Sequence, residues 1–165
     1  MFDLIEDKAL EKTKSRALKI LGSRQMSAKD ISERLVQKGE SEENASETVA
    51  WLQRIGAIDD ALYAQSICRH YCSKSYGIAR IKNELFKRGI PRDLWDEAIS
   101  EIDLPEVYDA ALEFLQKKLK GSTDKDEVRK AADALCRRGF SYEDSRQALS
   151  RYLESIENTE EMMET

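Results

Sequence analysis

The residues best suited to metal binding or nucleophilic chemistry are in the run Cys68-Arg-His70-Tyr-Cys72, which holds the only histidine of the chain. Cysteines four residues apart share one face of a helix, and thiolates with imidazole can bind zinc. A structural zinc site needs four ligands, however, and the third cysteine, Cys136, is far along the sequence. Cysteines in such positions are more often small buried apolar residues. We therefore expect no metal.

Paired carboxylates are the other residues with catalytic potential. Asp59 and Asp60 stand directly before a predicted helix. Carboxylates favour the positive end of a helix dipole, so this position is explained by folding. Acid–base catalysis by a carboxylate pair needs a pocket, which the sequence does not indicate. The chain also lacks a glycine-rich phosphate-binding motif. We expect a protein that is not an enzyme and that uses no cofactor.

The sharpest functional feature is a basic segment in an acidic protein. The net charge of the chain is −5, yet residues 66–92 contain seven bases and one acid, Glu84. Such a segment suits phosphate groups or an acidic partner. On a helix over residues 78–88, three of the bases are predicted to share a face, and the others with three tyrosines lie nearby. The predicted partner or DNA contacts are Tyr63, Arg69, Lys74, Tyr76, Arg80, Lys87 and Arg88.

These residues belong to the second of three similar segments spaced 50 residues apart. Each segment has an apolar helix face, then a basic residue, then a glycine, which is how helices end. The corresponding residues are Ile31, Leu35 and Gly39, then Ile81, Leu85 and Gly89, then Ala131, Leu135 and Gly139. The third helices extend the pattern through Val49, Ile99 and Leu149, and through Leu52, Ile102 and Tyr152. The chain is therefore predicted to consist of three copies of a helical unit.

Each unit is predicted to have three helices, giving an all-α fold of three tandem three-helix, helix-turn-helix-like repeats in an elongated, curved array. The predicted repeats are residues 8–56, 57–103 and 104–154, followed by an acidic, disordered tail at 155–165. The predicted helices are 8–21, 28–38, 42–55, 60–75, 78–88, 92–102, 105–119, 124–138 and 142–154. Start signals are the pairs Ser27/Asp30, Thr123/Asp126 and Ser141/Asp144, and Pro91 opens the helix over 92–102.

Composition is consistent with an intracellular helical protein. Hydrophobic residues make up 41% of the chain and charged residues 36%, with only two prolines. No apolar run approaches the roughly 20 residues that span a bilayer. The acidic residues near Met1 do not resemble a signal peptide, and three cysteines do not form a disulfide framework. We expect a cytoplasmic protein, no membrane contact, and a monomer because no heptad seam is present.

A three-helix unit with basic later helices also suggests a free-standing DNA-binding protein of the helix-turn-helix type. Base readout requires Asn, Gln or Arg at the exposed start of a recognition helix. Two of the predicted third helices instead start with carboxylates, at Glu42-Glu43 and at Glu143-Asp144. Sequence-specific duplex binding is therefore disfavoured. Contact with a protein surface, or loosely with nucleic acid, remains open, as does a passive scaffold.

Two motifs of the middle unit resemble those of the RecX family of bacterial regulatory proteins. The first is Gly56-Ala-Ile58-Asp59-Asp60-x-x-Tyr63-Ala64. The second is Gly77-x-x-Arg80-Ile81-x-x-Glu84-Leu85-x-x-Arg88-Gly89-Ile90. The resemblance covers about residues 10–153, so the acidic tail lies outside it.

The resemblance implies a function that the residues alone do not. Members of this family are small cytoplasmic, non-enzymatic modulators of the RecA recombinase. They bind the filament of RecA on single-stranded DNA and usually restrain its growth, ATP hydrolysis, strand exchange and co-protease activity, in DNA repair, recombination and the SOS response. Asp59, Asp60, Tyr63 and Gly77 are types that helix starts and turns demand, whereas Arg80, Lys87 and Arg88 are harder to explain by folding.

Overall fold

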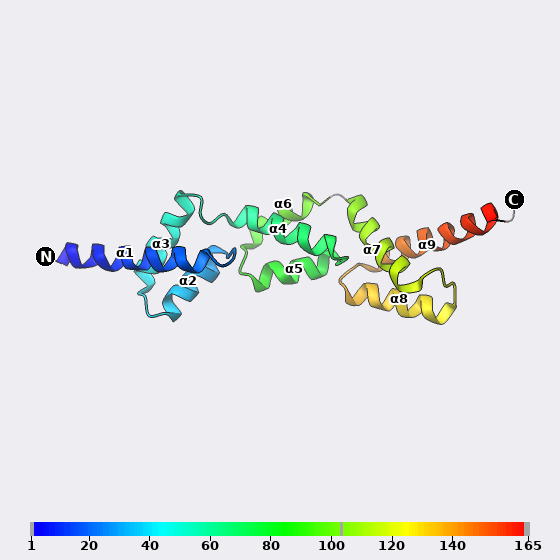
Figure 1. Ribbon diagram of the computed structural model, residues 1–165, viewed down its shortest axis with the longest axis horizontal. Helices are drawn as coiled ribbons and strands as arrows, with labels where there is room; N and C mark the ends of the chain where they lie inside the picture. Colours follow the sequence, from blue (N-terminus) through cyan, green and yellow to red (C-terminus); the bar gives the residue numbers. More distant parts are fainter. Residues whose placement is uncertain (1, 103, 164–165) are drawn as a thin grey trace. The chain divides into compact units, whose positions relative to one another are not determined.

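The computed structural model describes residues 2–102 and 104–163, and it confirms the all-α prediction (Figure 1). The described residues form nine α-helices and one short 3-10 turn, Arg92–Leu94, with no β-strand among them. The helices are α1 Phe2–Leu21, α2 Ala28–Gln37, α3 Glu42–Arg54, α4 Asp60–Ser73, α5 Ile78–Lys87, α6 Trp95–Ser100, α7 Leu104–Leu119, α8 Lys125–Arg137 and α9 Tyr142–Met163.

Contacts divide the chain into two compact units, which are not the same as the three predicted repeats. From here on, the first and second unit are these two parts of the chain. The first unit is Met1–Ala64 with Leu85–Trp95, and the second is Gln65–Glu84 with Asp96–Thr165. Helices α1, α2 and α3 pack on one another in the first unit, and α7, α8 and α9 do so in the second. Helices α4 and α5 contribute residues to both units. The repeat boundaries drawn from the sequence stay a prediction.

Burial follows the predicted spacing of 50 residues. The leucines that precede the repeat glycines are fully buried, as are the apolar residues one turn earlier in α2, α5 and α8. The same spacing places Leu52, Ile102 and Tyr152 in the core, with Ile102 just beyond the end of α6, whereas Val49, Ile99 and Leu149 are half-buried. The helix faces predicted to be apolar are therefore the faces on which the helices pack.

The three repeat glycines end α2, α5 and α8 as predicted. Gly39, Gly89 and Gly139 have φ values of +91°, +66° and +89°, the left-handed conformation that favours glycine. The amide of the next residue donates in each case to the carbonyl oxygen of the buried leucine. These bonds are Glu40 to Leu35 at 3.1 Å, Ile90 to Leu85 at 3.1 Å and Phe140 to Leu135 at 3.2 Å.

Two of the predicted helix starts are confirmed and one is wrong. The Ser27 hydroxyl accepts from the amide of Asp30 at 3.1 Å. Ser141 and Asp144 cap each other reciprocally, at 3.0 and 3.1 Å. Helix α8 is capped by Asp124 instead of Thr123, through bonds from the amides of the second and third helical residues at 3.1 and 3.0 Å. A carboxylate one residue later in the chain takes the position because it accepts both amides at once.

The last helix of the middle segment is shorter than predicted. The 3-10 turn occupies its first three residues, and the α-helical part is only Trp95–Ser100. Pro91 precedes the turn with φ −56° and ψ +140°, an extended conformation outside the helix. The Trp95 indole N–H donates to the carbonyl oxygen of Ile90 at 3.0 Å, which fixes the tight turn against the end of the preceding helix.

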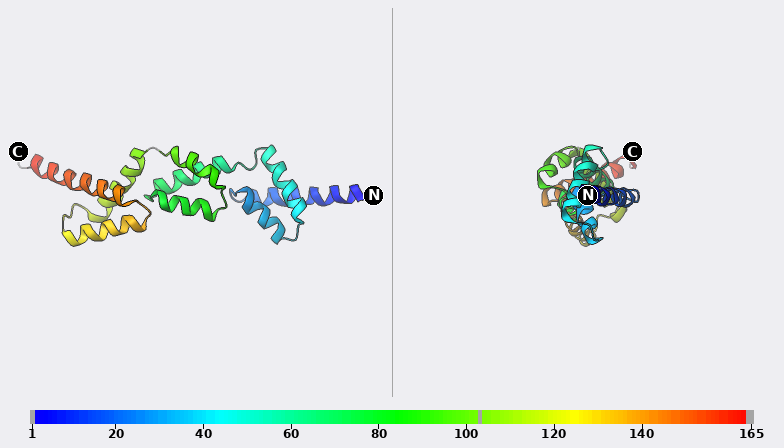
Figure 2. Two further views of the ribbon diagram at one scale, coloured as in Figure 1. Left: turned by 180° about the vertical axis from the view of Figure 1, so that it is seen from behind. Right: turned by 90° about the vertical axis from the view of Figure 1, so that its left-hand side faces the viewer.

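Helices α1 and α9 are longer than predicted. Helix α9 continues through residues 155–163, where the sequence predicted a disordered tail. Figures 1 and 2 show these turns extending past α7 and α8. Glutamate and methionine are good helix formers, which favours continuation of the helix through these residues. The Ser155 and Thr159 hydroxyls also donate to carbonyl oxygens one turn earlier, at 2.6 and 2.7 Å.

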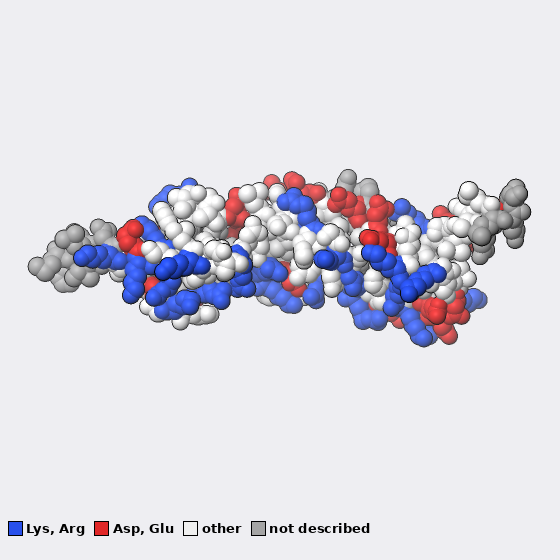
Figure 3. Space-filling view, in the orientation of Figure 1, with Lys and Arg blue, Asp and Glu red and all other residues white. Residues whose placement is uncertain are grey.

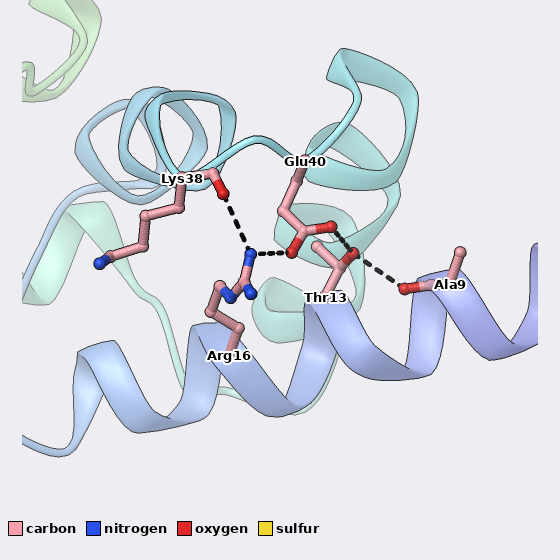
Figure 4. A network of polar contacts seen from close by, with 5 residues as sticks. All are labelled: Ala9, Thr13, Arg16, Lys38 and Glu40. Atoms are coloured by element: carbon pink, nitrogen blue, oxygen red, sulfur yellow. Dashed lines mark hydrogen bonds and ion pairs between the residues drawn. The ribbon is translucent and has the colours of Figure 1, made fainter.

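The first repeat differs from the others at the residue after its glycine. Glu40 stands where the other repeats have buried Ile90 and Phe140. Its carboxylate pairs with the Arg16 guanidinium and accepts from the Thr13 hydroxyl at 2.7 Å (Figure 4). Arg16 also donates to the carbonyl oxygen of Lys38 at 3.2 Å. Charged groups of α1 thus satisfy the C-terminal end of α2.

Candidate functional site

The predicted contact residues fall in both units, so each unit is described by itself. In the first unit, Tyr63 is 9% exposed and its hydroxyl accepts from Arg88 Nη1 at 2.9 Å. Arg88 is half-buried. Burial and the charge of Glu33 raise the pKa of the Asp30 carboxyl, and the Arg88 charge opposes that rise only slightly. Tyr63 and Arg88 therefore hold the end of α5 to the start of α4.

The adjacent carboxylates also act in folding. Asp59 Oδ1 accepts from the amide of Leu62 at 3.0 Å and so caps α4. Asp60 Oδ1 accepts from the amide of Ala28 at 2.9 Å, which satisfies the start of α2 from another helix. Burial raises the pKa of Asp60, against the lowering effect of that hydrogen bond, and the charge of Asp59 raises it further.

In the second unit, the structure brings together Tyr76 and Arg80. The guanidinium carbon of Arg80 lies 5.6 Å from the centre of the Tyr76 ring. Arg80 Nη2 is 3.1 Å from Oε1 of Glu84, a buried carboxylate one turn further along α5. The Arg80 side chain is 38% exposed. Its charge is thus partly offset by a neighbour on its own helix.

Sequence reasoning missed Arg138 as the partner of this tyrosine. Its guanidinium carbon lies 4.1 Å from the Tyr76 ring centre and 4.9 Å from that of Phe114. Nε and Nη2 donate to the carbonyl oxygens of Ser75 and Lys74, at 2.7 and 2.6 Å. Arg138 was recognised only as a basic residue at a helix end, because nothing in the sequence points to partners more than 60 residues earlier.

Gly77 lies at the same place for a steric reason. A Cβ atom there would be 2.2 Å from the carbonyl oxygen of Gly139 and 2.3 Å from the amide nitrogen of Phe140. The Gly77 amide donates to the carbonyl oxygen of Arg138 at 3.0 Å, and the Ala79 amide donates to that of Gly139 at 3.1 Å. The C-terminal end of α8 therefore meets the N-terminal end of α5, where their dipoles attract.

Three predicted contact residues have exposed side chains: Arg69, Lys74 and Lys87. Arg69 lines a cleft of about 530 Å³ in the second unit, together with three carboxylates of α7. Those carboxylates are Glu106, Asp109 and Glu113. The cation therefore faces an acidic wall, which weakens the local attraction for phosphate. The contact role of all seven residues stays a prediction.

The structure also places exposed cations outside the predicted segment. Figure 3 shows Lys and Arg side chains gathered over α2 and the neighbouring part of α1 in the first unit. The exposed ones in these helices and the loop between them include Lys19, Arg24, Lys29 and Lys38. The sequence carries a signal for this surface, because residues 12–29 contain six bases and no acid, but the predicted contacts were drawn from residues 66–92 alone.

Cys68 and Cys72 behave as small core residues and not as nucleophiles, whereas Cys136 is exposed. Cys68 and Cys72 are buried, and burial raises the pKa of the Cys68 thiol to about 11. Burial, with the nearby Glu106 charge, also raises the pKa of Cys72. A thiol with a raised pKa is a poor nucleophile at neutral pH. Within residues 2–102 and 104–163, no group of three or more His, Cys, Asp or Glu side chains is placed to hold a metal ion.

No described helix is both long enough and apolar enough to cross a membrane.

Comparison with known protein families finds three-helix domains in the second and third predicted repeats. Residues 59–99 match the second three-helix domain of RecX, and residues 105–149 match its third three-helix domain. The regulatory protein RecX of Pelodictyon phaeoclathratiforme is 31% identical over 134 residues, covering 81% of this chain and 84% of that protein. RecX of Xanthomonas campestris pv. campestris is 33% identical over 127 residues, covering 76% of this chain and 78% of that protein.

The fold is also similar to that of a solved RecX structure. The crystal structure of RecX from Lactobacillus salivarius superposes with a TM-score of 0.79, over 88% of this chain and 97% of that one. The two sequences are 21% identical, so this likeness concerns the fold alone. Together, the matched domains and the sequence relatives show that the chain belongs to the RecX family of regulatory proteins.

Proposed function

We propose that this protein binds the filament of RecA on single-stranded DNA and mainly inhibits its ATP hydrolysis, strand exchange and co-protease activity. It acts in the cytoplasm, as a regulator and not as an enzyme. The observation that carries the proposal is the similarity to regulatory proteins named RecX, which extends over 81% of the chain at 31% identity.

The surface supports contact with a protein–DNA filament more than independent reading of duplex DNA. Lys74 and Lys87 offer exposed cations to phosphates or carboxylates, and Arg69 is an exposed cation beside the carboxylates of α7. The helices α3 and α9, which would enter the major groove of DNA in a helix-turn-helix protein, have acidic residues in their first turns. Phosphates would repel those helix starts, so the free-standing DNA-binding protein is the weaker hypothesis.

The test is the rate of ATP hydrolysis by the cognate RecA on single-stranded DNA, measured while this protein is titrated from far below the RecA concentration to equimolar. We expect a clear fall below stoichiometric amounts, because one modulator bound to a filament acts on many RecA protomers. An unchanged rate at equimolar protein would remove the inhibitor hypothesis.

Binding to DNA without RecA separates the two hypotheses. Fluorescence anisotropy of labelled single-stranded and duplex DNA, repeated at several salt concentrations, should show weak binding for a modulator. Tight binding that falls steeply with salt would favour the DNA-binding protein. A variant with Arg69, Lys74 and Lys87 changed to alanine tests the predicted contacts. Its matched control changes three exposed lysines elsewhere, Lys117, Lys118 and Lys120.

A further inference from the structure

The second helix of each repeat exposes an apolar side chain directly after its buried leucine. Val36 is 38% exposed and Phe86 is 65% exposed, and Cys136 is exposed at the equivalent position. Single exposed apolar residues are ordinary on protein surfaces. Here they recur at a spacing of 50 residues, while the preceding leucines are fully buried. Folding requires the leucines, but it does not require an exposed phenylalanine.

Each of these apolar residues is followed within two positions by a cation at the end of its helix. Exposed Lys38 follows Val36, exposed Lys87 follows Phe86, and exposed Arg137 follows Cys136. An apolar side chain beside a cation is complementary to an apolar depression with a carboxylate at its rim. The cation is the next residue in α5 and α8, whereas in the first repeat Gln37 takes that position and Lys38 follows it. The pairing of an exposed apolar residue with an adjacent cation is therefore closest in α5 and α8.

We propose that Phe86, with Val36 and Cys136 at the equivalent positions, is the anchor that docks this protein onto a repeating protein surface whose apolar pockets are rimmed by carboxylates. The inference rests on the proposed function, in which the partner is a RecA filament with many identical protomers. Phe86 is the strongest anchor, because buried aromatic residues contribute most to binding at interfaces.

Single-stranded nucleic acid is the competing partner for an exposed aromatic residue beside a lysine, since bases stack on aromatic rings. The equivalent positions argue against it. Val36 and Cys136 have no π-face on which a base could stack, whereas both fit an apolar pocket. A set of positions that shares apolar character but not aromaticity therefore favours a protein surface.

The experiment measures binding of the full-length protein to RecA filaments assembled on single-stranded DNA. Phe86→Ser should weaken binding by about tenfold or more, the usual effect of losing an aromatic anchor. Phe86→Leu should keep most of the affinity, because leucine fills an apolar pocket but cannot stack on a base. The matched control is Tyr142→Ser, which removes a 79% exposed aromatic residue elsewhere and should bind as the wild type does.

The outcomes separate the inference from the function on which it rests. If the wild type binds filaments and Phe86→Ser binds equally well, the anchor is refuted and the proposed function stands. If Phe86→Leu loses as much as Phe86→Ser, or if both variants lose affinity for bare single-stranded DNA, Phe86 stacks on bases and the protein-pocket inference is overturned. If the wild type does not bind filaments at all, both proposals fail. Urea unfolding of each variant, expected to match the wild type, shows that the changes act on binding.

Discussion

The close approach of Gly77 to the end of α8 allows a stringent prediction. A methyl group at residue 77 would lie 2.2 Å from the carbonyl oxygen of Gly139. Because the opposing atoms are backbone, no side-chain rotation relieves the clash, and the two segments must separate by roughly 1 Å to reach ordinary contact. Gly77→Ala therefore tests whether this packing stabilises the second unit.

The cost follows from what that separation disrupts. Two backbone hydrogen bonds, of 3.0 and 3.1 Å, cross the contact from the amides of Gly77 and Ala79. Losing them costs about 1–3 kcal/mol and the overpacking a further 1–3 kcal/mol, while alanine returns about 0.4–1 kcal/mol by restricting the unfolded chain. We expect the free energy of unfolding to fall by about 1–5 kcal/mol.

The assay is urea unfolding followed by far-UV circular dichroism, with Gly22→Ala as the matched control. A Cβ atom at residue 22 would lie 3.5 Å from the nearest atom, the carbonyl oxygen of Leu18, which is ordinary contact. That variant should stay within about 0.5 kcal/mol of the wild type. If Gly77→Ala is as stable as the wild type, the two helix ends are not packed as closely as described.

Further predictions concern Arg138, Asp60 and the cysteines. Arg138→Lys should lower the free energy of unfolding by about 1–3 kcal/mol, because lysine cannot donate in the same fork to two carbonyl oxygens while stacking between two rings; urea unfolding measures this. Asp60→Ala should cost about 1 kcal/mol through the lost acceptor of the Ala28 amide, whereas Asp60→Asn keeps that acceptor. Because burial raises the pKa of Asp60 above its unfolded value of 3.8, its contribution to stability is present at lower pH and is lost as pH rises through the folded pKa. The wild type should therefore lose stability above about pH 4, and Asp60→Asn should not show that loss. Unfolding midpoints measured across pH test this, and the same pH profile for both proteins would contradict the prediction. In native protein an alkylating reagent should label exposed Cys136 before Cys68, whose thiol is buried with a pKa of about 11, as peptide mass spectrometry will show.

The parts of the fold that the sequence predicted are those set by neighbouring residues. Leu35, Leu85 and Leu135 are buried because helical periodicity alone determines the face on which they lie. The glycines after them were predictable for the same reason, since a helix end depends on a few consecutive positions.

The parts that were missed depend on residues far apart in the chain. Arg138 reaches the carbonyl oxygens of Lys74 and Ser75, and Glu40 is bonded to α1. No local pattern specifies such partners. For the same reason, the sequence could group Tyr63 and Arg88 as candidate contacts but could not show that they bond to each other. The length of α9 was missed because charge composition was taken as a sign of disorder.

The end of α2 differs from the ends of α5 and α8 in what lies against its glycine. Gly139 packs against Arg80, and Gly89 packs against the side chain of Lys29, whereas no described atom lies within 4 Å of a Cβ placed on Gly39. Beside this open position stands the carboxylate of Glu40, paired with Arg16. A side chain that packed there, as Arg80 packs on Gly139, would have to remove the remaining water from that ion pair, which costs free energy. One charged residue in place of an apolar one thus makes the end of α2 a polar surface, where the ends of α5 and α8 are followed by buried apolar residues.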